Sequence, residues 1–157
     1  ALLCDEVLRD EPGQTAVLDR MLDLLVISFL RAWFARPEAE PPAWYVAQGD
    51  PVVGRALRLM QNNPAEPWTI ASIALESGVS RAVLARRFSE LVGEPPMAFL
   101  TRWRLDLAAD LLRHGDMTIG AVAQQVGYSS PYALSTAFKR ERGVSPSEHR
   151  QLVTVPV

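Results

Sequence analysis

The sequence has few of the side chains that metal centres need. Its 157 residues include one cysteine, Cys4, and two histidines, His114 and His149. A single cysteine excludes a disulfide framework and any zinc site that uses several cysteines. His114 lies at the end of a predicted helix, where the helix dipole is enough to account for it. We therefore expect no bound metal.

Motifs for nucleotide binding and covalent catalysis are also absent. The sequence contains no G-x-G-x-x-G or G-x-x-x-x-G-K signature and no G-x-S-x-G nucleophile elbow. Asp106 and Asp110 share one face of a predicted helix, but Arg102 and Arg113 flank them. A solvated charged surface explains these carboxylates better than a catalytic pair does. We expect neither enzymatic activity nor a cofactor.

No apolar run is long enough to cross a membrane. The longest, residues 22–34, includes Asp23 and Arg31 and falls short of the ~20 apolar residues that a bilayer requires. It follows no basic segment and precedes no small-residue cleavage site, so nothing indicates export. We expect a cytoplasmic protein. Because the chain starts with Ala1 rather than Met, we also expect a fragment of a longer protein.

The composition is that of a globular protein whose charge is unevenly distributed. Hydrophobic residues make up 48% of the chain and charged residues 22%, with a net charge of −2, so a packed core is expected. Residues 1–50 carry 4 basic and 9 acidic side chains (−5), whereas residues 51–157 carry 12 and 9 (+3). This asymmetry is more informative than the total, which alone would argue against nucleic-acid binding.

Helix start and stop signals occur along the whole chain, and no alternating strand pattern does, so the predicted fold class is all-α. Apolar residues along 15–34 predict a helix that is apolar on several sides and needs a partner. Prolines in residues 36–42 predict a linker. Caps, prolines and glycines then predict helices at 51–62, 70–77, 81–92, 96–114 (stopped by Gly115), 119–126, 131–142 and from 146 onward.

An internal repeat is the most informative feature. Residues 69–74 (Thr-Ile-Ala-Ser-Ile-Ala) align with residues 118–123 (Thr-Ile-Gly-Ala-Val-Ala), and after one inserted residue the match continues to Gly143 and Pro146. Each copy has a short helix, a glycine turn and a second helix. This is the order of a helix-turn-helix, whose second helix enters the DNA major groove. We expect Gly78 and Gly127, at the two turns, to have positive φ.

The spacing of the two copies suits one face of a DNA duplex. The linking helix of about 17 residues spans ~26 Å, so the two second helices can reach successive major grooves. A helical wheel that buries residues 84, 88, 134 and 138 directs a second set of side chains outward. This set consists of Ala82, Arg86 and Ser89 in the first copy and Tyr132, Thr136 and Lys139 in the second.

Residues 51–153 resemble the DNA-binding domain of the AraC/XylS family of bacterial transcription regulators. The stretch from Ile119 through Gly127-Tyr128-Ser129 to Ser145-Pro146 carries the resemblance most strongly. The resemblance implies seven helices and two helix-turn-helix units. We expect a DNA-binding domain over 49–157, divided into a first subdomain (49–96), a linker helix (97–114) and a second subdomain (115–157). Residues 1–48 resemble, more loosely, the end of a cupin-like sensor domain with a dimerising helix, followed by a linker.

The resemblance also implies which side chains meet DNA. Base contacts are expected from Arg81, Ala82, Ala85 and Arg86 in the first unit and from Pro131, Tyr132, Ala133 and Thr136 in the second. Phosphate contacts are expected from Ser80, Arg87, Ser89, Ser129, Ser130, Ser135, Lys139 and Arg140. Alanines at two positions where some members have long polar side chains leave Arg86 as the main reader of the first groove. His149, where tyrosine is frequent, affects packing only.

We therefore predict a sequence-specific regulator that binds double-stranded DNA. Further expected partners are RNA polymerase, a second copy of the chain through the 15–34 helix, and an effector of the sensor domain. One alternative is a weakly specific architectural DNA binder, which would bind scrambled duplex equally well. The other is a helical protein-interaction module, which would shift no duplex at low salt.

Overall fold

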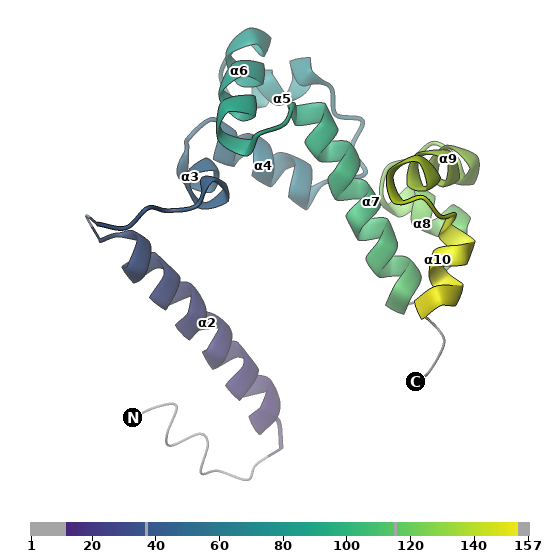
Figure 1. The fold of residues 1–157 in the computed structure, drawn as a ribbon, viewed down its shortest axis with the longest axis horizontal. Coiled ribbons are helices and arrows are strands. Elements are labelled where there is room, and N and C mark those ends of the chain that lie inside the picture. The colour runs from purple at the N-terminus through teal and green to yellow at the C-terminus, as the bar shows by residue number, and fades with distance from the viewer. Residues whose placement is uncertain (1–11, 37, 115, 154–157) are drawn as a thin grey trace. The chain divides into compact units, whose positions relative to one another are not determined.

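A computed structural model describes residues 12–36, 38–114 and 116–153, so Cys4 and the expected helix stop at Gly115 lie outside the described residues. The chain forms two compact units, residues 1–42 and residues 43–157 (Figure 1). Every regular element in the described ranges is an α-helix, which confirms the predicted all-α class.

In the described part of the first unit, residues 12–36 and 38–42, the one helix is α2 (Gln14–Phe34), which matches the helix expected there. None of its side chains is buried, although it is rich in large apolar residues. Phe29 and Trp33 stack on each other with ring centroids 6.0 Å apart, and the Arg36 guanidinium lies over the Trp33 ring. Neither α2 nor any other described helix is long and apolar enough to cross a membrane.

The described residues of the second unit form the expected seven helices and one more. They are α3 (Ala43–Gly49), α4 (Val53–Asn62), α5 (Ile70–Glu76), α6 (Arg81–Val92), α7 (Pro96–His114), α8 (Ile119–Gln125), α9 (Pro131–Arg142) and α10 (Pro146–Val153). Helix α3 was not predicted, because its seven residues follow directly after the linker prolines. It buries Ala47 and packs on α4 and α6. The compact unit accordingly begins at residue 43, ahead of the boundary expected at 49.

The repeated caps and turns form as predicted. The side chains of Thr69 and Thr118 accept backbone N–H groups at the starts of α5 and α8, and those of Ser80 and Ser130 do so for α6 and α9. The turn glycines have positive φ, 71° at Gly78 and 82° at residue 127. Each copy is therefore a helix-turn-helix with the same local chemistry.

Helix α7 joins two separate hydrophobic cores. Its N-terminal part packs Phe99 and Leu100 against α3, α4, α5 and α6. Its C-terminal part packs Leu105 and Leu112 against α8 and α9. Helix α10 then packs on α7 and α9, and the His149 ring meets the Phe138 ring edge to face at 5.4 Å.

The Asp50 carboxylate stabilises the start of helix α4. The Asp50 carboxylate accepts the backbone N–H groups of Val52 and Val53 at 3.0 and 2.9 Å and forms an ion pair with Arg87 of α6. Burial raises the pKa of Asp50, but the bonds from Val53, Val52 and Arg87 outweigh it and leave the pKa below its ordinary 3.8. The ionised carboxylate therefore stabilises the fold.

The two turn glycines should differ in their tolerance of a Cβ atom. At Gly78 an added Cβ meets nothing within 4 Å, so Gly78→Ala should cost only the left-handed backbone penalty of about 1–2 kcal/mol. At Gly127 the Cβ would lie 2.8 Å from the Cα atom of Ala65, so Gly127→Ala should cost at least about 1 kcal/mol more. Urea unfolding of both variants measures the difference. Equal losses would contradict the close approach at Gly127.

Replacing Asp50 should destabilise the fold in a pH-dependent way. We expect Asp50→Ala to lower the free energy of unfolding by about 1 kcal/mol at pH 7, because the backbone N–H groups of Val52 and Val53 lose the carboxylate that accepts their bonds. Asp50→Asn should lose less, because an amide oxygen also accepts N–H bonds. Since the folded-state pKa of Asp50 is depressed, its charge stabilises the fold above pH 3.8, and this stabilisation is lost as pH falls through the folded pKa. Urea unfolding should therefore show a smaller Asp50→Asn deficit at pH 3 than at pH 7.

Candidate nucleic-acid interface

Helices α6 and α9 present the same face at matching positions of the repeat. From residue 81 to 88 the side chains are exposed, exposed, half-buried, buried, half-buried, exposed, half-buried and buried, and residues 131 to 138 follow the same order. The buried positions are Leu84 and Phe88 in α6 and Leu134 and Phe138 in α9. Each second helix is thus fixed by two core side chains and keeps one side open to solvent.

The residues expected to contact bases lie on this open side. Arg81, Ala82 and Arg86 of α6 are exposed, and Ala85 is half-buried between them. On α9 the exposed residues are Pro131, Tyr132 and Thr136, with Ala133 half-buried. The Tyr132 residue is 81% exposed. An 81%-exposed aromatic ring on a helix is available for contact with a partner molecule.

Arg86 has a partner on its own helix, Glu90, which was not predicted from the sequence. Its Nη1 atom lies 3.2 Å from an Oε1 atom of Glu90, one turn further along α6, and both side chains are more than half exposed. Exposed pairs at this spacing contribute only about 0.3–0.5 kcal/mol. The guanidinium can therefore leave Glu90 for a stronger hydrogen-bonding partner at little cost.

Most residues expected to contact phosphate are also accessible. Ser80, Ser129, Lys139 and Arg140 are exposed, and Ser89, Ser130 and Ser135 are half-buried. The hydroxyl oxygens of the two capping serines accept backbone N–H bonds, so each hydroxyl still has a proton to donate. Such donors at a helix start suit an anion.

Arg87, which the resemblance implies contacts phosphate, has an acidic partner within the protein. Its guanidinium is ion-paired with Asp50, and its side chain is only 38% exposed. Arg142 is also paired within the unit, 2.5 Å from Asp106 of α7, and its guanidinium lies over the Phe138 ring. Arg87 therefore attaches α6 to the residues before α4, and Arg142 attaches α9 to α7. Neither contact could be inferred from the residues next to these arginines in the sequence.

Two arginine–aspartate pairs on α7 form as the sequence indicates. Arg102 lies 3.6 Å from Asp106, and Arg113 lies 3.5 Å from Asp110. Within the described ranges no three residues of the metal-binding types come together.

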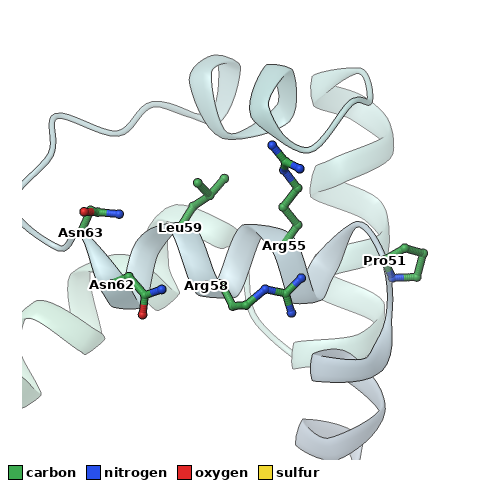
Figure 2. A pocket seen from close by; sticks show the side chains of 6 residues that line it. All are labelled: Pro51, Arg55, Arg58, Leu59, Asn62 and Asn63. Atoms are coloured by element: carbon green, nitrogen blue, oxygen red, sulfur yellow. The ribbon is translucent and has the colours of Figure 1, made fainter.

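A polar hollow lies on α4, apart from both second helices. It is lined by Pro51, Arg55, Arg58, Leu59, Asn62 and Asn63 (Figure 2). Arg55 and Leu59 project to one side of α4, whereas Arg58 and Asn62 project to the other. Arg55 also lies 3.7 Å from Glu76 at the end of α5. No residue of α6 or α9 lines this hollow, so it is distinct from the face described above.

Family models match both units of the chain. A model described as a helix-turn-helix domain matches residues 54–152, and one described as a cupin matches residues 1–35.

Curated relatives are regulators of transcription by name. An AraC-like transcription regulator of Streptomyces lividans is 39% identical over 97% of this chain and 50% of its own length. The HTH-type transcriptional regulator AlkR of Acinetobacter baylyi is 36% identical over 93% of this chain and 47% of its own length. The chain thus spans about half the length of the curated relatives it matches.

Solved structures show the same arrangement of helices. The DNA-binding domain of AdpA, a global transcriptional factor solved with a target DNA, has a TM-score of 0.62 and 30% identity, covering 66% of this chain and 92% of that one. An AraC-type regulator from Chromobacterium violaceum has a TM-score of 0.64 and 30% identity, covering 71% and 99%. With its duplicated helix-turn-helix unit, the chain belongs to the AraC/XylS family of transcription regulators.

Proposed function

We propose that residues 43–157 read DNA with α6 and α9 in two successive major grooves on one face of a duplex. The observation that carries this proposal is the matching open face of the two helices, each held by the same pair of buried residues. Helix α7, with 19 residues, is about 28 Å long. That length fits two recognition helices about one DNA turn, ~34 Å, apart.

In this proposal the two helices read bases with different side chains. Arg86 leaves Glu90 and donates two hydrogen bonds to the O6 and N7 atoms of a guanine. Beside it, Ala82 and Ala85 offer only methyl groups, which can contact a thymine methyl. In the second groove Tyr132 and Thr136 supply the polar and apolar contacts.

Phosphate contacts would hold the protein in register on the duplex. Lys139 and Arg140 are the exposed cations beside α9's open face, and the serine hydroxyls at the starts of α6 and α9 add neutral donors. Arg87 would reach a phosphate only by leaving Asp50, and we assign it to the fold instead.

The remaining partners concern the whole protein. We infer that the apolar surface of α2 is covered by the rest of a cupin-like sensor domain or by a second copy of α2. The cupin match over residues 1–35 and the exposure of α2's large apolar side chains support this inference. As a regulator of transcription, the full-length protein would act in the cytoplasm, respond to an effector of that domain and contact RNA polymerase.

Arg86→Ala should separate base reading from general attraction to DNA. On a duplex selected from a random library by the wild-type chain, affinity should fall about ten- to hundredfold, because a bidentate arginine–guanine contact discriminates by about 1–3 kcal/mol. On scrambled duplex the loss should be much smaller.

Lys139→Ala is the matched control for the loss of one positive charge. It should weaken both duplexes alike and lower the salt dependence of binding by about one unit. Fluorescence anisotropy at two salt concentrations measures both variants. Equal loss on both duplexes with Arg86→Ala would show that the first unit reads no base. An unselective wild-type chain would favour the architectural alternative, and one that binds no duplex would favour the interaction module.

Charges placed on α2 should dissociate any dimer formed through it. Leu22 and Leu25 are 52% and 51% exposed, and Leu22→Asp with Leu25→Asp should shift sedimentation of a dimeric parent toward the monomer. Thr15→Asp, which adds a charge without removing an apolar side chain, should leave the mass unchanged. A parent that is monomeric at high concentration would exclude the dimer and leave the sensor domain as the partner of α2.

A further inference from the structure

The two turns of the repeat differ in what surrounds them. An added Cβ at Gly127 would lie 2.8 Å from both the Pro64 carbonyl oxygen and the Ala65 Cα atom, whereas one at Gly78 would meet nothing within 4 Å. Residues 64 and 65 belong to the loop between α4 and α5, in the first subdomain. The turn of the second helix-turn-helix therefore docks directly on the first subdomain.

Arg104 of α7 bonds to the same loop and lies beside the turn. Its Nε atom donates to the Pro64 carbonyl oxygen and its Nη2 atom to the Glu66 carbonyl oxygen, each at 2.7 Å. The Nη2 atom would also lie 2.9 Å from a Cβ at Gly127. Burial lowers the pKa of Arg104, against the opposing effect of Tyr128, the residue that follows the turn. One guanidinium thus joins the linker helix, the first subdomain's loop and the second subdomain's turn.

The loop that receives these bonds is itself stiffened. The Trp68 indole N–H donates to the Asn63 carbonyl oxygen at 2.8 Å, and the Trp68 backbone N–H donates to the Glu66 carbonyl oxygen at 2.7 Å. Trp68 also packs against the first core. The clamp therefore anchors in a fixed part of the first subdomain.

Arg104 lies at the point where α7 passes from the first core to the second. It lies between Leu100, which belongs to the first core, and Leu105, which belongs to the second. This is where α7 spans from one core to the other, and where bending or twisting of the helix would change the angle between α6 and α9. A contact beside the helix axis opposes both movements.

We propose that Arg104 is a positioning residue that, with Gly127 and the residue 64–66 loop, fixes the separation and relative rotation of α6 and α9. The clamp thereby makes the protein selective for the spacing between two half-sites in DNA, in addition to their sequences. This inference rests on the proposed function, which supplies the two half-sites.

Arg104→Met tests the clamp because it keeps most of the apolar stem and removes the donors. The probes are a selected duplex, the same duplex with one base pair inserted between the half-sites, and each half-site alone. For the wild-type chain the insertion should lower affinity about tenfold, as the loss of one good base contact does. For Arg104→Met the same insertion should lower affinity by less than about threefold, and half-site affinities should be unchanged.

Arg113→Met is the matched control on α7, since Arg113 pairs only locally with Asp110 in the contacts described above. It removes the same charge and should keep the full penalty for the insertion. An Arg104→Met chain that penalises the insertion as the wild type does would overturn the proposal. So would a wild-type chain that tolerates the insertion.

A measurement without DNA separates failure of the clamp from failure of the proposed function. In a Cys4→Ser background, spin labels at the exposed positions Ala71 of α5 and Gln124 of α8 report the distance between the subdomains. The distance distribution should be narrow in the parent and broader in Arg104→Met. An unchanged distribution would overturn the clamp even if DNA binding is intact, and a broadened one would support it even if no duplex binds.

A second pair of variants guards against misfolding of Arg104→Met. Gly127→Ala should broaden the distance distribution by pushing the turn from the loop, while Gly78→Ala, at the equivalent but open turn, should leave it narrow. Broadening in both would mean that general loss of stability, not the clamp, sets the distances, and would overturn the proposal.

Discussion

The packing of one helix into two hydrophobic cores is the constraint on which the DNA-binding unit depends. Leu100 and Leu105 of α7 lie in different cores, so neither subdomain is complete without this helix. A cavity at either position would weaken one core by about 2–5 kcal/mol and loosen the recognition helix that rests on it. The stability of each subdomain and the placement of α6 and α9 therefore depend on the same residues of α7.

The sequence predicted the helix caps and turns, which depend only on residues a few positions apart and recur in both copies of the repeat. Capping residues such as Ser80 and Ser130, and the turn glycines, act within a few positions along the chain, so their spacing alone reveals the helices that they bound. The open faces of α6 and α9 followed from the same logic, because burying Leu84 and Phe88 determines which side chains face outward. For these reasons the all-α fold and the candidate face were predictable.

Contacts between distant segments were not predictable. Arg87 lies in an exposed-looking basic run beside Arg86, yet it is ion-paired with Asp50, which lies 37 residues earlier in the chain. Arg104 looks like one more solvated cation, whereas its guanidinium bonds two carbonyl oxygens of a loop about forty residues earlier. Helix α3 was missed because the prolines before it indicate a linker and its seven residues give too short a pattern.

The unequal surroundings of the two turns have a consequence for how such a duplicated module can diverge. At position 78 the backbone needs only a residue that adopts a left-handed conformation, and asparagine or aspartate can do so. At position 127 the neighbouring backbone leaves no room for any side chain. Because the turn of the second copy packs on the first, position 127 accepts only glycine, whereas position 78 accepts other residues. The two copies of the repeat are therefore under different sequence constraints at the same structural position.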